Sequence, residues 1–134
     1  MALNQLTSRF LIIASIMSFL WVCSYNYNYT CFQIKIGRLN LLTYMAWVAG
    51  LVMVGLWWDY INKNTNWSFS KRFLITGVLW FIAIITLEWI GYNKMNIQLD
   101  SDYPGLFGME LMHGPGYLKL YYLTAWALYL YIAF

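Results

Sequence analysis

The densest grouping of side chains capable of chemistry lies between residues 109 and 113. Glu110 and His113 stand three residues apart and can share one face of a helix, with Met109 and Met112 beside them. Thioether and imidazole ligands suit copper, whereas a carboxylate with an imidazole suits iron or zinc. Because His113 is the only histidine of the chain, a closed zinc site or a di-iron bundle lacks ligands. Copper or iron binding therefore stays an alternative that needs ligands from another chain.

A single carboxylate, Glu88, interrupts an otherwise uncharged apolar run. Ionisable residues inside a hydrocarbon segment mark proton relays, ion sites or buried pairs. Glu88 lies near one end of its run, so we expect a structural pair with a cation from another helix or a nearby link; the candidates are Arg38, Lys94 and Lys119. An ion or proton path centred on Glu88 is the alternative.

Other reaction classes lack the residues that they need. No serine stands in a Gly-x-Ser-x-Gly elbow, there is no second histidine for a base, and the glycines lack a Walker lysine. The basic residues are scattered rather than gathered in a patch, which excludes nucleic acid as the expected partner. We assign no catalytic residue and expect no catalytic activity of the chain's own.

The composition indicates whether the chain folds in water or in a lipid bilayer. Hydrophobic residues make up 62% of the 134 residues and charged residues only 10%, against roughly 25% charged in an ordinary soluble domain. Eight basic and five acidic side chains cannot cover the surface of a soluble fold of this length. The sequence predicts an integral membrane protein that meets a lipid bilayer and binds lipid.

The apolar runs are long enough for helices and lack the strict alternation of barrel strands. They predict an all-α bundle forming one integral membrane domain, residues 1–134, with a longer third link; its four transmembrane helices are expected at residues 10–25, 39–60, 73–92 and 116–134. After Lys119 the last run gives only about 22 Å of helix. We expect this segment to cross with Lys119 snorkelling to the interface.

The links carry weaker signals. The second link concentrates cations between Asn62 and Arg72, which favours both termini on the cytoplasmic or equivalent side. Within the same stretch, Asp59 and Lys63 are spaced for a helical ion pair. Cys23 and Cys31 flank the first link and can form a disulfide if that link faces an oxidising compartment, although unpaired buried thiols are the first expectation.

Small residues predict where helices pack. Ala14 with Ser18, and Ala46 with Gly50, are small residues four positions apart, which lets helix backbones approach closely in lipid. Trp80 and Trp126 fall in the middle of predicted spans, and we expect them to face another protein surface rather than lipid tails.

These features favour a non-catalytic accessory subunit of a larger integral membrane complex. Its partners would be other integral membrane subunits, and an energy-converting or oxidoreductase assembly such as a respiratory complex is the expected host. Two alternatives remain at this stage: a small metal-binding or redox protein using residues 109–113, and an ion or proton path at Glu88.

Overall fold

The structure, a computed structural model, describes residues 3–29, 34–97, 102–109 and 111–134. Within these ranges the chain is mostly helical, with four α-helices: α1 (Leu3–Tyr25), α2 (Leu41–Asn64), α3 (Phe69–Asn93) and α4 (Gly116–Ala133). α1 and α3 contain the predicted segments 10–25 and 73–92, and α4 matches 116–134 to within one residue, whereas α2 begins two residues into the predicted segment 39–60 because Leu39 and Asn40 form a strand. Two short strands, β1 (Lys35–Ile36) and β2 (Leu39–Asn40), and the 3-10 helix η1 (Leu106–Gly108) lie in the links.

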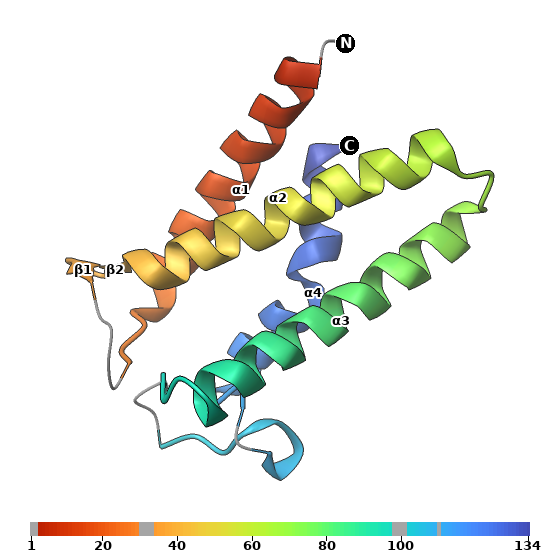
Figure 1. Ribbon diagram of the computed structural model, residues 1–134. Helices are drawn as coiled ribbons and strands as arrows, with labels where there is room; N and C mark the ends of the chain where they lie inside the picture. Colours follow the sequence, from red (N-terminus) through yellow and green to blue (C-terminus); the bar gives the residue numbers. More distant parts are fainter. Residues whose placement is uncertain (1–2, 30–33, 98–101, 110) are drawn as a thin grey trace.

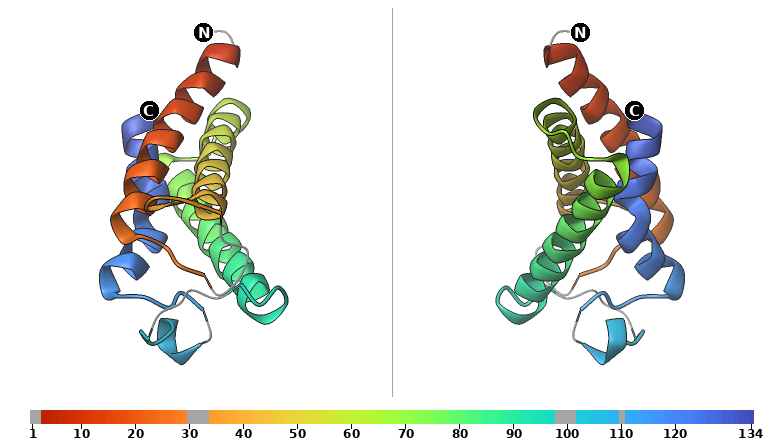
Figure 2. Two further views of the ribbon diagram at one scale, coloured as in Figure 1. Left: turned by 90° about the vertical axis from the view of Figure 1, so that its left-hand side faces the viewer. Right: turned by 90° about the vertical axis from the view of Figure 1, so that its right-hand side faces the viewer.

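The helices run up and down through one bundle (Figure 1). Both termini and the α2–α3 turn lie toward one end, which we call the turn end, and η1 and the third link lie at the other, the link end (Figure 2). The contacts between helices place α2 and α4 between α1 and α3, since each of the two outer helices packs against both inner ones.

Local capping explains where several helices begin and end. Asn26, with φ 58°, closes α1 in the left-handed conformation that ends many helices. The Asn40 side chain accepts the Thr43 N–H at 3.2 Å at the start of α2, and Ser68 accepts the Lys71 N–H at 3.3 Å at the start of α3. Gly37, with φ 58°, provides the tight turn between β1 and β2.

Three helices are long and apolar enough to cross a membrane: α1 from Thr7, α2 and α3. The fourth, α4, is shorter and carries five of the chain's tyrosines. Three of its polar rings, those of Tyr122, Trp126 and Tyr129, are buried in the bundle, whereas those of Tyr117 and Tyr131 are exposed. The buried polar rings lower the hydropathy of the helix but face protein rather than lipid.

Aromatic rings contact one another through the centre of the core. Trp21 stacks on Tyr121 at 3.7 Å between ring centroids, and Trp47 lies 5.0 Å from Tyr122. Trp80 lies 6.0 Å from Trp47 between ring centroids. Trp80 and Trp126 are therefore buried against protein rather than lipid, as predicted, and the surface that they face belongs to this chain.

Candidate functional site

The most elaborate polar arrangement is built around Glu88, about five residues before the end of α3. Its Oε2 accepts the backbone N–H of Met112 at 3.2 Å. A side-chain hydrogen bond also joins it to the hydroxyl of Tyr122 on α4. The carboxylate thus connects α3 with α4 and with the third link.

The hydrogen bonds continue from Tyr122 across the link end of the bundle. Tyr122 is hydrogen-bonded to Tyr27, and the indole Nε1–H of Trp21 donates to the Tyr27 hydroxyl at 2.7 Å. We call Trp21, Tyr27, Tyr122 and Glu88 the polar cluster. Each phenol has one proton, so when Glu88 is ionised Tyr27 donates to Tyr122 and Tyr122 donates to Glu88.

Tyr27 and Tyr29, in the first link, attach this cluster to the start of α2. The Asn40 side-chain amide donates to the Tyr27 carbonyl at 3.4 Å, and the Thr43 hydroxyl donates to the Tyr29 hydroxyl at 3.0 Å. Burial raises the pKa of both phenols above the ordinary value of 10.0. Both therefore stay protonated at neutral pH and act as hydrogen-bonding neutral groups.

The expected ion pair of Glu88 is not formed among the described residues. Lys119 instead donates to the Pro104 carbonyl at 2.7 Å, and Lys94 lies over the Trp89 ring at 5.4 Å. The physical reason is that a backbone N–H and a phenol already satisfy the carboxylate. By contrast, the predicted pair of Asp59 with Lys63 is present at 2.7 Å.

The third link folds back on itself next to this cluster. Leu106 N–H donates to the Leu111 carbonyl at 2.9 Å, which closes a loop over η1. Met112 then adopts φ 52°, a left-handed conformation uncommon for a residue with a side chain, and is buried. The His113 ring packs on Tyr92 at 5.1 Å between centroids.

The predicted metal ligands differ in their exposure to solvent. Met109 is exposed, Met112 is buried and His113 is half-buried, while Glu110 lies outside the described residues. Among the residues that the structure places, no three His, Cys, Asp or Glu side chains gather as a metal site would require. A site using these residues would still need Glu110 and ligands from a second chain.

The small residues singled out from the sequence lie in different surroundings. Ala14 and Ser18 are fully buried on α1, and the Ser18 hydroxyl is among the described polar atoms without a hydrogen-bond partner. Gly50 faces the Trp80 ring, where an added Cβ would lie 3.5 Å from Cζ3. Ala46, four residues earlier, is exposed.

Two closer approaches were not predicted. A Cβ on Gly77 would lie 2.7 Å from Trp126 Cζ2, and a Cβ on Gly55 would lie 2.8 Å from the Tyr129 hydroxyl. The lack of a side chain at these glycines lets the large rings of α4 fit against α3 and α2. Glycine inside an apolar run was the available signal, but it does not say which ring fills the space.

The structure describes only one of the two cysteines. Cys23 is a half-buried thiol near the end of α1, whereas Cys31 lies outside the described residues. The disulfide alternative for the first link therefore stays a prediction.

Comparison with protein families, with curated proteins and with solved structures finds no match to this chain. The fold defines the class of the protein as a mostly helical chain. Three of its helices are long and apolar enough to cross a membrane. The polar cluster joins three parts of the chain, and its arrangement suits a structural role.

Proposed function

We propose that this chain is a non-catalytic accessory subunit of a larger integral membrane complex and crosses the bilayer four times. The outward faces of α1, α2 and α3 carry apolar side chains along their length, as a lipid-facing surface requires. In this proposal α4 crosses as well, because it runs back from the link end toward the turn end beside the other three helices (Figures 1 and 2).

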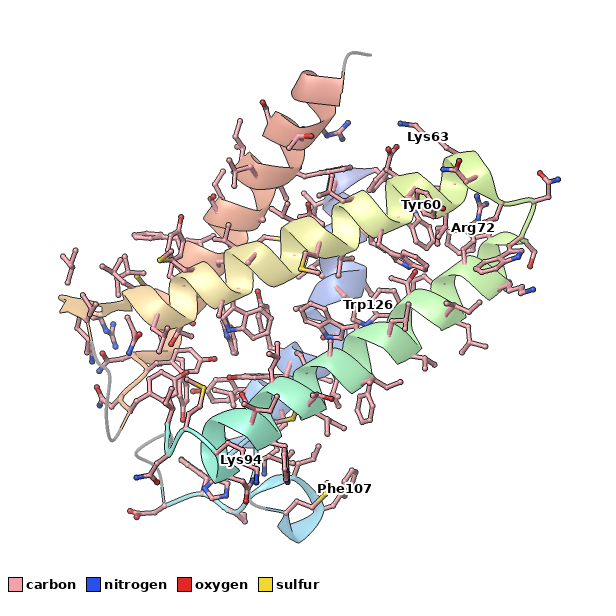
Figure 3. The ribbon with its side chains drawn as sticks, in the orientation of Figure 1. Tyr60, Lys63, Arg72, Lys94, Phe107 and Trp126 are labelled. Carbon is pink, nitrogen blue, oxygen red and sulfur yellow. The ribbon has the colours of Figure 1, made fainter. Side chains whose placement is uncertain are left out.

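The observation that carries the subunit role lies outside the spans, in residues 103–109, which we call the apolar loop. Phe107 is 87% exposed, and the flanking Tyr103 and Met109 are 53% and 43% exposed. Figure 3 shows the Phe107 side chain at the outer edge of the link end, away from the helices. Lipid tails cover helix flanks, whereas the apolar groups of a link beyond the helix ends are covered by the membrane interface or by a neighbouring subunit; in this proposal the cover is a neighbouring subunit.

The backbone supports the same conclusion. Phe107 has φ 52°, a conformation that costs a non-glycine residue roughly 1–2 kcal/mol. The ring itself contributes little to offset that cost, because 87% of the side chain is exposed. A partner subunit that buries the ring would offset it, as aromatic anchors do at protein interfaces.

The interior argues against a proton path as the main role. The polar cluster lies at the link end, and toward the turn end the described core continues with buried apolar side chains; these include Leu51, Val54 and Ile84. The polar chain ends at the Trp21 indole, a donor that accepts no proton.

Replacing Phe107 with asparagine tests the subunit role. Asparagine tolerates the left-handed conformation, so the loop keeps its fold while the ring is lost. We expect co-migration with larger partners after gentle detergent extraction to weaken at least about tenfold, because burying such a ring contributes about 1.5–3 kcal/mol. Native gels with mass spectrometry of the co-migrating proteins provide the readout.

The matched control is Leu87→Ala, which trims an exposed apolar side chain on the flank of α3. In this account Leu87 faces lipid, so the control variant co-migrates as the native chain does. The proposal is wrong if the native chain elutes alone, or if Phe107→Asn leaves co-migration unchanged.

A further inference from the structure

The turn end, opposite the polar cluster, carries an unbalanced set of cations. Lys63 closes α2, and Lys71 and Arg72 lie in the first turns of α3. Asp59 pairs with Lys63, but among the described residues no carboxylate lies within ion-pair distance of Lys71 or Arg72. Within the described chain, no carboxylate therefore compensates these two positive charges.

Their position in the helix makes this arrangement costly without an anion. The N-terminus of a helix carries partial positive charge, which disfavours cations there by about 0.3–1 kcal/mol each. Helices commonly place an acidic residue in this turn, but α3 has none. An external anion would turn this unfavourable arrangement into a favourable one.

The guanidinium of Arg72 is partly held in place. One of its N–H groups, on Nη1, donates to the Asn62 side chain, so the group is held across the α2–α3 turn. The Nε atom is buried and has no hydrogen-bond partner. Buried donors are rarely left unpaired in proteins, so this edge of the guanidinium still lacks an acceptor. Arginine suits phosphate because its planar donors can bind two oxygens together.

Aromatic side chains lie in the same turn and in the helix ends on either side of it. Lys71 Nζ lies 4.7 Å from the centre of the Trp67 ring, and the Trp57 and Tyr60 rings lie 6.2 Å apart in the last turns of α2. Phe69 is exposed beside them. Figure 3 shows Tyr60, Lys63 and Arg72 together where α2 passes into α3. Trp and Tyr gather at the membrane–water interface.

We infer that the α2–α3 turn binds the phosphate headgroup of an anionic phospholipid, through Lys71 and Arg72. The acyl chains would lie along the exposed apolar flank of α3, beginning at Phe69. This inference rests on membrane insertion but not on the subunit role, because it concerns the opposite end of the bundle from the apolar loop.

The test compares lipids retained by the whole chain after reconstitution. The protein is placed in vesicles of phosphatidylcholine containing a minority of phosphatidylglycerol, re-extracted in mild detergent, and its bound lipids are counted by native mass spectrometry. We expect phosphatidylglycerol to be enriched over its share of the vesicle. Lys71→Gln and Arg72→Gln should each lower that enrichment about fivefold, as about 1 kcal/mol per interfacial cation implies.

Two further variants keep the test decisive if Arg72→Gln fails to fold. Asp59→Asn releases Lys63 from its ion pair at the same turn and should raise phosphatidylglycerol retention. Lys94→Gln removes one charge at the link end and should leave retention unchanged. Equal loss with Lys94→Gln, no enrichment in the native chain, or competition by inorganic phosphate as strong as that by the lipid would overturn the inference.

Discussion

Glu88→Ala is expected to release the third link from the bundle. The substitution leaves the Met112 N–H and the Tyr122 hydroxyl without the acceptor that they share. An abandoned buried donor costs about 1–3 kcal/mol. We expect amide exchange at Met112 to become roughly ten to a hundred times faster, since each 1.4 kcal/mol is about tenfold. Hydrogen exchange read by mass spectrometry over residues 111–115 measures it.

The matched variant is Glu88→Gln, which keeps a carbonyl oxygen at the same place and removes the charge. A structural acceptor predicts near-native exchange for this variant, and no change in proton leak through reconstituted liposomes. If the native chain conducts protons and Glu88→Gln abolishes the current while exchange stays native, Glu88 serves a proton path and the structural account is contradicted.

Trp80→Ala is expected to give the largest loss of stability of any single substitution in the core. The ring is buried, its Nε1–H donates to the Tyr122 carbonyl at 2.7 Å, and it fills the space left by Gly50. Removing a buried tryptophan side chain costs about 3–5 kcal/mol. In lipid this loss is one of packing and hydrogen bonding, because no hydrophobic force holds helices together there.

The thermal midpoint in mild detergent, followed by intrinsic fluorescence, measures the effect of Trp80→Ala. The control is Trp89→Ala, which removes an equally large ring that is exposed on the same helix and is expected to change stability by less than about 1 kcal/mol. Equal losses from the two variants would mean that α3 does not face α4 through Trp80.

The positions of the helices follow from the length of the uncharged runs, which is why four helices were predicted near their observed places. The ends of the helices depend on local contacts, which cannot be predicted from the length of an uncharged run. The third helix begins at Phe69 rather than Phe73 because Ser68 caps it, and the second continues to Asn64 across the Asp59–Lys63 pair.

The partners of Glu88 could not be predicted from the sequence in the same way. A carboxylate in an apolar run indicates that some donor must approach it, and a lysine was the expected one. The donors are instead a backbone N–H in the third link and a phenol on α4. Both depend on how a link folds back over the bundle, which residue types and spacing alone do not encode.

For residues 109–113, spacing predicted a shared helical face that the described chain does not form. Spacing alone suggested that Glu110 and His113 could share a helical face, with Met109 and Met112 beside them. The described chain is not helical there, and the left-handed Met112 turns the backbone so that its own side chain is buried while Met109 stays exposed. Residues three or four apart share a face only if the segment between them is helical.

The most direct test of the account is whether lipid is the medium of this fold. Membranes from cells that express the chain are washed with urea at high salt and sedimented at high speed, then extracted with mild detergent. The account predicts that the chain stays in the pellet through the wash and is released only by detergent. Recovery of folded chain in the supernatant before detergent is added would contradict it.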